Sequence, residues 1–151
     1  MIIVEQSDPR DPQATALLQS SHALMESLFP PEDNFYLSID ALCAPDIRFF
    51  TAREGATILG TGALAIKQGY GEIKSMFVAE PARGRGVADA LMRQIEDVAR
   101  GEGLAALMLE TGNVLHAAHA LYRRHGFTDR GPFGDYPAAT SSIFMEKGIA
   151  D

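Results

Sequence analysis

The sequence predicts a mixed α/β (α+β) fold in which helices flank a central sheet of about six to seven strands. Strand-like and helix-like segments alternate along the chain, which is typical of layered folds that contain both elements. Hydrophobic residues make up 46% of the 151 residues and charged residues 22%, which excludes a disordered or collagen-like chain. A chain of this length commonly forms one domain, so we expect a single domain over residues 1–151.

The first half of the chain contains one helix with clear boundary signals and a series of strands. Asp11 and Pro12 form an N-cap followed by proline at the first helical position, and apolar residues at helical spacing continue towards Pro30. A second, weaker helix is expected at residues 35–42. Strands are expected at residues 2–5, 46–53, 56–67 and 70–79, and the last three of these form an antiparallel meander with tight turns.

The second half contains the strongest amphipathic helix, at residues 87–100. Val87, Leu91, Ile95 and Val98 recur on one face, and Gly101 follows as a stop signal. Residues 104–110 are typical of a buried strand, so this region predicts a β-α-β unit with two parallel strands. A last helix is expected at residues 114–125, a loop at 132–137 and a final strand near 141–147.

Composition excludes several classes of protein. The single Cys43 cannot form an internal disulfide, and no apolar run approaches the roughly 20 residues of a membrane-spanning helix. Residues 1–5 lack the basic flank and long apolar stretch of a signal peptide. The formal charge of −7, from 13 Lys and Arg against 20 Asp and Glu, argues against broad nucleic-acid binding. We therefore expect a soluble, cytoplasmic protein with no membrane or nucleic-acid partner.

A glycine-rich segment, Ala-Arg-Gly-Arg-Gly-Val-Ala at residues 82–88, lies between a strand and the amphipathic helix. The first amide groups of a helix are unpaired and lie at the positive end of its dipole. Gly84 and Gly86 would let a ligand approach the backbone, and Arg83 and Arg85 add positive charge. This combination favours phosphate binding, although a short motif of this kind also occurs in plain surface turns with solvated arginines. The residues do not match the P-loop or the dinucleotide-binding fingerprint.

Three segments together resemble the GNAT superfamily of N-acetyltransferases. Residues 83–88 match its acyl-CoA motif, Gln/Arg-x-x-Gly-x-Gly/Ala, and residues 70–78, Tyr-Gly-Glu-Ile-Lys-Ser-Met-Phe-Val, resemble its fourth strand. Residues 118–127, Ala-His-Ala-Leu-Tyr-Arg-Arg-His-Gly-Phe, resemble its Ala-x-x-Leu-Tyr-x-x-x-Gly-Phe signature. The resemblance covers about residues 47–147. It implies a mostly antiparallel sheet with a β-α-β acyl-CoA-binding core, and acetyl-CoA as the cosubstrate.

The resemblance also implies roles for individual residues. In the family, the fourth strand carries a bulge and splays from the fifth, and the pantetheine inserts into the gap. The backbone of Met76, Phe77 and Val78 would pair with the pantetheine, and one of these amides would stabilise the oxyanion of the tetrahedral intermediate. Tyr122 matches the tyrosine that donates a proton to the departing thiolate. The pyrophosphate would lie on the backbone amides of Arg83, Gly84, Arg85, Gly86, Val87 and Ala88.

Glu72 is the candidate base. A carboxylate about ten residues before the glycine-rich loop could deprotonate an amine, directly or through a water, and some family members use a fourth-strand glutamate in this way. Strand alternation places Glu72, Lys74, Met76 and Val78 on one face. The alternative is that Glu72 and Lys74 only pair at a solvated strand end. For Tyr122 the alternative is core packing with a satisfied hydroxyl.

Other polar residues carry less weight. Leu115 occupies the position at which many relatives have a cofactor-contacting Asn, and Asn113 is two residues out of register. His116 and His119 are expected on the exposed side of the last helix, and no metal is expected because two ligands do not make a site. Cys43 is expected to be a small buried hydrophobic residue.

The predicted function is acetyl transfer from acetyl-CoA to a primary amine of a small molecule, by direct attack on the thioester. A protein or peptide acceptor and a non-catalytic acyl-CoA-binding module are the alternatives. The acceptor should lie between the first two helices and the loop at 132–137, with Phe133 and Tyr136 as wall residues. A homodimer is also considered, because dimers are common in the family.

Overall fold

Residues 1–150, which the computed structural model describes, form a seven-stranded sheet in the order β1-β2-β3-β4-β5-β7-β6. Only the β4–β5 pair is parallel, and the other neighbours in the sheet are antiparallel. The predicted fold class is therefore confirmed. The strands are β1 (Ile3–Gln6), β2 (Ile47–Glu54), β3 (Thr57–Ile66), β4 (Tyr70–Val78), β5 (Ala106–Gly112), β6 (Thr128–Arg130) and β7 (Ser142–Gly148).

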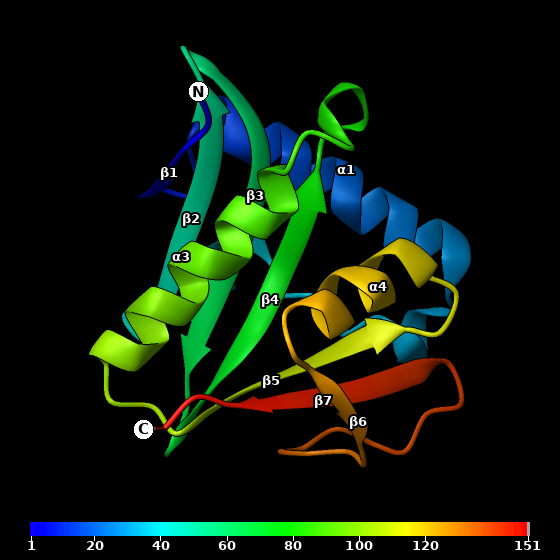
Figure 1. Cartoon of the computed structure of the whole chain (residues 1–151). Coiled ribbons are helices and arrows are strands. Elements are labelled where there is room, and N and C mark those ends of the chain that lie inside the picture. The colour runs from blue at the N-terminus through cyan, green and yellow to red at the C-terminus, as the bar shows by residue number, and fades with distance from the viewer. Residues whose placement is uncertain (151) are drawn as a thin grey trace.

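Helices cover both faces of the sheet (Figure 1). The helices α3 (Val87–Gly101) and α4 (His116–Arg124) lie on one face, and α1 (Pro12–Leu28) and α2 (Ile39–Leu42) lie on the other. Single 3-10 turns at Pro31–Asp33 and Glu80–Ala82 complete the connections. Within the described residues, no helix is long and apolar enough to cross a membrane.

Local signals set the helix starts. The Asp11 side chain accepts hydrogen bonds from the amides of Gln13 and Ala14, so α1 begins at the predicted N-cap. The second helix was predicted at residues 35–42 but is confined to Ile39–Leu42, because the Ser38 hydroxyl caps it by accepting from the Ala41 amide. The preceding residues are therefore free to line a cavity instead.

The core is split by the sheet. On the α3 face, Leu91 and Ile95 pack with Leu64 and Leu107, and all four side chains are fully buried. On the α1 face a smaller cluster gathers Ala14, Leu18, Leu42, Phe49 and Ala63. Burial of apolar side chains on both sides fixes the sheet between its helices.

The strands β4 and β5 pair only at their beginnings and then diverge (Figure 1). Their ladder joins Tyr70–Glu72 to 106–108 and ends there. On the other side of β4, Thr61 lies opposite Phe77 and Ala63 opposite Lys74, so two residues of β4 face the single Gly62. This is a β-bulge, and Ser75 within it has a φ of +58°. The bulge and the splayed pair that the family resemblance implied are thus both present.

The bulge changes which side chains share a face of β4. After it, Met76 and Val78 pack with the α3-side core, as does Ile73 before it. A Cβ added to Gly62 would lie 2.6 Å from the Met76 Sδ atom and 3.1 Å from Ile95, which places Met76 under α3. The prediction that Glu72, Lys74, Met76 and Val78 share one face is wrong, because the extra residue shifts the alternation by one.

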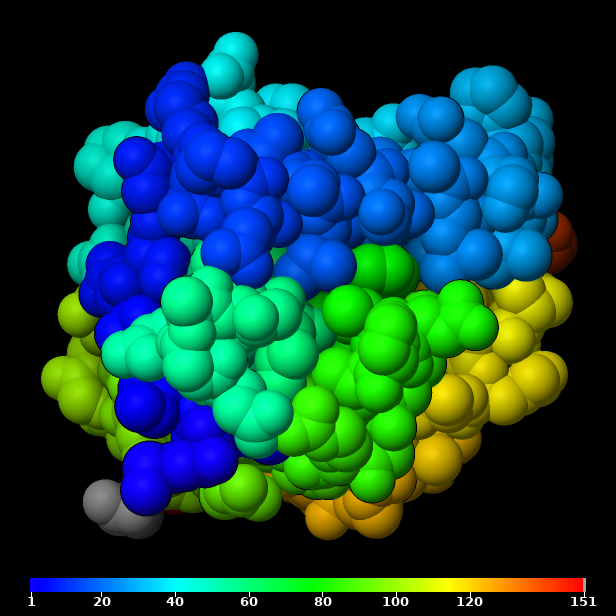
Figure 2. Space-filling model, turned by 90° about the horizontal axis from the view of Figure 1, so that it is seen from above, coloured from blue at the N-terminus to red at the C-terminus, as the bar shows by residue number. Residues whose placement is uncertain are grey.

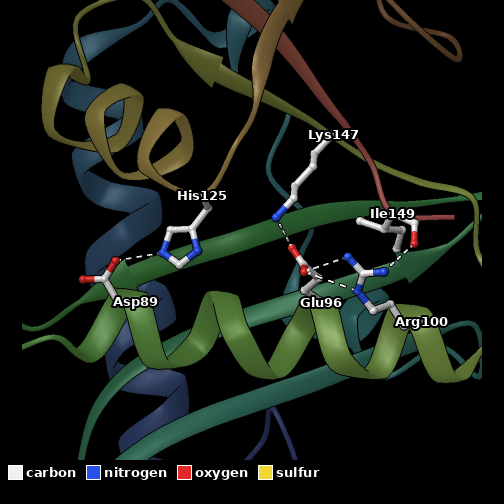
Figure 3. Close-up of polar contacts among 6 residues, drawn as sticks. All are labelled: Asp89, Glu96, Arg100, His125, Lys147 and Ile149. Atoms are coloured by element: carbon white, nitrogen blue, oxygen red, sulfur yellow. Dashed lines mark hydrogen bonds and ion pairs between the residues drawn. The ribbon is translucent and has the colours of Figure 1, made fainter. Parts of the chain in front are cut away.

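Polar contacts hold α3 against its neighbours (Figure 3). The Asp89 carboxylate lies 2.8 Å from Nε2 of His125, just beyond α4, and the Lys147 ammonium of β7 lies 2.5 Å from Glu96. Arg100 donates to the Ile149 carbonyl at 2.6 Å. The Asp89 contact fixes the start of α3 relative to the end of α4, and the other two fix its second half relative to β7 and the residue after it. The helices α3 and α4 flank the opening between β4 and β5.

Candidate active site

The glycine-rich loop forms an open start to α3. Gly84 and Gly86 have φ values of +78° and +81°, a conformation that side-chain-bearing residues rarely adopt. A Cβ at either position would meet no atom within 4 Å, so the backbone there is bare. Gly86 is the N-cap of α3 and provides no side-chain cap for its first amides. These amides are therefore available to an anion, as the sequence predicts.

The two arginines of the loop lie at the surface, where Figure 2 shows the loop (green) beside the β2–β3 turn (teal). Arg83 Nε donates to the Val78 carbonyl at 3.3 Å, and its guanidinium lies 5.9 Å from the centroid of the Phe77 ring. Arg85 pairs with Glu54 of β2 at 2.6 Å. Both positive charges thus flank the bare backbone, whereas the Val87 side chain is buried in the core and leaves only its backbone to a ligand.

A first cavity of about 130 Å³ lies where β4 and β5 diverge. Its walls come from α1, the bulge, the end of β5 and α4. Ser75 and Met76 of the bulge line it, and the Ser75 hydroxyl is buried without a hydrogen-bond partner among the described residues. A buried hydroxyl of this kind is normally bonded, so this wall has an unused polar group.

Tyr122 lines the same cavity from α4 and is 6% exposed. Its hydroxyl makes no hydrogen bond to any of residues 1–150, unlike the satisfied hydroxyl expected from simple core packing. Burial, and to a smaller extent the charge of Glu110, raises the pKa of Tyr122 well above its ordinary value. The hydroxyl therefore keeps its proton at neutral pH and can donate it to a group in the cavity.

Glu110, near the end of β5, is a lining residue that sequence reasoning missed. Burial raises the pKa of its carboxyl, against the opposing effects of a 2.7 Å hydrogen bond from Ser142 and of the Lys74 charge. A carboxyl with a raised pKa beside a protonated tyrosine is a typical acid–base arrangement. The signal in the sequence was a single carboxylate at the end of an otherwise apolar strand. The same pattern is typical of a strand that simply ends at the surface.

Glu72 does not line this first cavity, whereas Lys74 does. Its carboxylate accepts a hydrogen bond from the Tyr136 hydroxyl and lies 3.5 Å from the Lys74 ammonium. Lys74 also donates to Tyr136 at 2.7 Å and to the Phe35 carbonyl at 2.9 Å. Glu72 is only 5% exposed, so the predicted pair exists but is buried and joined to the β6–β7 loop instead of solvated.

A second cavity, of about 570 Å³, lies over this Glu72–Lys74–Tyr136 cluster. Residues 35–37 and 46–47 line it, together with residues 133–137 of the β6–β7 loop. Phe133 and Tyr136, the two wall residues that the sequence predicts, both line this cavity. The two cavities share the lining residues Phe35, Tyr36 and Lys74, so a molecule in one lies next to a molecule in the other.

Three expectations about single residues need correction or qualification. His119 was expected to be exposed but is buried, with Nε2 2.8 Å from the Gly112 carbonyl oxygen, because α4 rests on the end of β5. Cys43 is only half-buried and its Sγ lies 2.8 Å from an Arg10 nitrogen. Leu115 lines the first cavity with an apolar side chain, and Asn113 donates to the Thr140 carbonyl.

Metal ligation has no geometric support in the part of the chain that the structure describes. There, no three His, Cys, Asp or Glu side chains lie close enough to hold an ion.

Comparison with known proteins identifies the family. Residues 14–127 match the Acetyltransferase (GNAT) family. An IAA acetyltransferase of Azospirillum brasilense is 43% identical over 150 residues, which cover 98% of each chain. A YsnE protein of Bacillus subtilis, described as an uncharacterized N-acetyltransferase, is 35% identical over 91% of this chain and 93% of its own length.

Solved structures show the same fold. A Klebsiella pneumoniae protein provisionally named an acyl-CoA N-acyltransferase has a TM-score of 0.82 and 30% identity, over 98% of this chain and 97% of its own. The PaiA N-acetyltransferase of Thermoplasma acidophilum, solved in complex with coenzyme A, has a TM-score of 0.75 at 15% identity, over 99% of each chain. The latter likeness concerns the fold alone.

Proposed function

The chain belongs to the GNAT family and is an N-acetyltransferase of that type, and we propose that it transfers the acetyl group of acetyl-CoA to a primary amine of a small molecule. The observation that carries the proposal is the bare, uncapped start of α3 at Gly84 and Gly86, directly beside the splayed end of β4. The relative named as an IAA acetyltransferase supports a small-molecule acceptor. We take residues 1–151 as one catalytic domain, and a cytoplasmic location and a homodimer stay predictions.

Each part of the cosubstrate has a matching surface. The amides of residues 83–88 and the charges of Arg83 and Arg85 would bind the pyrophosphate. Beyond the bulge β4 has left β5, so the backbone of Met76, Phe77 and Val78 faces the gap and would hold the pantetheine. One of these amides would stabilise the oxyanion that forms during attack.

Two acid–base roles follow from the first cavity and its neighbour. Tyr122 would donate its proton to the departing thiolate, because its hydroxyl is protonated, buried and unused by the fold. Glu72 is the base predicted from the sequence and would accept the amine proton from the acceptor side, directly or through a water. Glu110 is a second candidate base, on the thioester side.

The experiment is a thermal-shift titration with acetyl-CoA and with CoA. A ligand that binds only the folded state stabilises it by about 2.7 kcal/mol at 100 times its Kd. We expect saturable stabilisation of the wild type that is lost in Arg83→Glu/Arg85→Glu. The matched control is Arg10→Glu/Arg123→Glu, which changes the net charge equally and also breaks two surface ion pairs. If neither acetyl-CoA nor CoA stabilises the wild type, the proposal is refuted.

Turnover separates the proposed function from its alternatives. Thiol release from acetyl-CoA in the presence of small primary amines is the expected result. Saturable acetyl-CoA binding with no release for any small amine, but with release for peptides, would favour a peptide acceptor. Binding without release for either class would identify a non-catalytic acyl-CoA-binding module.

A further inference from the structure

The second cavity has a wall of aromatic rings. Five rings line it, from Phe35, Tyr36, Tyr70, Phe133 and Tyr136. They come from three separate parts of the chain: the segment before α2, the start of β4 and the β6–β7 loop. The volume of about 570 Å³ lies within the range of small-molecule sites, which are commonly lined by aromatic side chains with a few polar groups.

The rings are fixed before any ligand binds. Tyr36 is stacked on His22 of α1 with centroids 4.0 Å apart, and its hydroxyl donates to Glu26 at 2.6 Å. Tyr136 packs edge-on against Phe35 and Phe133, with centroids 5.3 Å and 5.2 Å apart. Side chains that are already ordered lose little entropy on binding, so a flat ligand can use these surfaces efficiently.

The charges below the rings are already paired. Glu72, Lys74 and Tyr136 bond to one another, and the Lys74 ammonium also lies 5.4 Å from the centroid of the Tyr136 ring. A ligand carboxylate or a second ligand ammonium placed there would lose water and gain no free counter-charge, which is costly. The remaining charged lining residues, Asp46, Lys67 and Asp135, are exposed at the rim.

One polar group remains available among the rings. The Tyr70 hydroxyl has no hydrogen-bond partner within residues 1–150, and it lies 3.5 Å from the position that a Cβ on Gly134 would take. The cavity therefore has aromatic walls, one free hydroxyl and a Glu72–Lys74 pair with no unpaired charge. Such a cavity favours a ligand that has one amine and an uncharged aromatic ring.

We propose that the acceptor is an arylalkylamine, a primary amine on a short alkyl chain that ends in an aromatic ring, with the ring held in the second cavity. The proposal rests on the proposed acetyltransferase function. The residues that line both cavities determine how such a ligand would lie. With its ring beside Phe35 and Tyr36, the ligand would extend its amine past Lys74 into the first cavity. The alkyl chain supplies this reach.

The test compares kcat/KM for matched amines with acetyl-CoA, by thiol release. The amines are 2-phenylethylamine, butylamine, phenylalanine and spermidine. We expect 2-phenylethylamine to exceed each of the others by about tenfold or more, the size of effect that pocket contacts produce. Equal or better turnover of butylamine, phenylalanine or spermidine would overturn the inference and leave the acetyltransferase function intact. Saturable acetyl-CoA binding with no amine acetylated would overturn the proposed function itself.

A pair of variants ties the preference to the ring wall. Tyr36 is 37% exposed, so its replacement should not prevent folding. Tyr36→Leu removes the ring at similar volume, and we expect the ratio of kcat/KM for 2-phenylethylamine to that for butylamine to fall by about fivefold or more. Tyr36→Phe keeps the ring and should keep the ratio. An unchanged ratio in Tyr36→Leu would show that the ring wall does not select the acceptor.

Discussion

Two carboxyl groups line the neighbouring cavities, Glu72 buried and Glu110 half-buried, and each has different hydrogen-bond and ion-pair partners. The Glu72 carboxylate pairs with the Lys74 ammonium and accepts a hydrogen bond from the Tyr136 hydroxyl. If Glu72 took up the amine proton, these contacts to the β6–β7 loop would weaken. Glu110 holds only the Ser142 hydroxyl, and its pKa is raised by burial. A base works best with a pKa near the operating pH, which favours Glu110 on electrostatic grounds.

Glu110→Gln should show this directly. We expect kcat/KM to fall by about 10²-fold at neutral pH, with loss of the acid limb of the pH profile. Glu72→Gln, which removes the other carboxylate at equal volume, is the matched comparison. A larger loss in Glu72→Gln, with the acid limb retained in Glu110→Gln, would assign the base to Glu72 instead.

The same Glu110→Gln variant should be more stable than the wild type at neutral pH. A raised folded-state pKa means that ionisation of Glu110 opposes folding, and this cost grows as the pH rises from the unfolded pKa through the folded one. Glutamine carries no such cost. The variant should therefore have a higher Tm than the wild type at pH 8, and this difference should disappear below about pH 4. A constant difference across this range would contradict the assigned cause.

Tyr122→Phe isolates the proton donor. The ring stays in the core and only the unbonded hydroxyl is removed, so Tm should change little. We expect kcat to fall by about 10²-fold while the Kd for acetyl-CoA, measured by thermal shift, stays within a few-fold. An unchanged kcat at saturating substrates would show that the thiolate leaves without this proton.

At the scale of the element, the β4 bulge is the feature that builds the site, and Ser75 is the residue that bears its strain. A non-glycine residue in the left-handed region costs about 1–2 kcal/mol, and the buried Ser75 hydroxyl adds an unmet hydrogen bond. Ser75→Gly should therefore be neutral or stabilising by up to about 1 kcal/mol in urea unfolding. Ser75→Val should destabilise by about 1–2 kcal/mol or more, because branched side chains tolerate positive φ poorly.

The matched control for the bulge is Thr57→Val. It makes a similar exchange of hydroxyl for methyl at the exposed start of β3, at a residue without positive φ. We expect a change within about 0.5 kcal/mol there. Equal stability of Ser75→Val and Ser75→Gly would mean that the bulge carries no such strain.

The elements also show how far the sequence can be read. The starts of α1 and α3, the β-α-β unit and the glycine-rich loop were predictable, because caps, helical spacing and glycine conformation act over a few neighbouring residues. The short β6 was missed, since its three residues become a strand only by pairing with β7. The reversed face of Met76 and the burial of His119 likewise depend on distant partners, Gly62 and Gly112. Glu110 joins the site only through the fold.

At the scale of the whole molecule, charge opposes the proposed cosubstrate. The chain has a formal charge of −7, and acetyl-CoA carries several phosphate charges of the same sign. Binding therefore relies on a local positive field at the start of α3, where the helix dipole and two arginines act together. Within that field, Glu54 competes for Arg85, with which it pairs at 2.6 Å, and Arg85 in turn lowers the pKa of Glu54.

Neutralising Glu54 should accordingly strengthen CoA binding. Glu54→Gln leaves Arg85 free for the pyrophosphate and lowers the repulsion near the loop, so we expect the Kd for CoA to fall by about two- to fivefold in about 0.1 M salt, where the Debye length is about 10 Å. The control is Asp97→Asn, the same change of charge at an exposed position roughly 16 Å along α3 from Gly86, which is beyond a Debye length.

The advantage of Glu54→Gln should shrink in about 1 M NaCl, where the Debye length is near 3 Å. An equal gain in Asp97→Asn would mean that net charge, and not the Glu54–Arg85 pair, limits binding. A gain in Glu54→Gln that persists undiminished in high salt would show that the effect is not electrostatic.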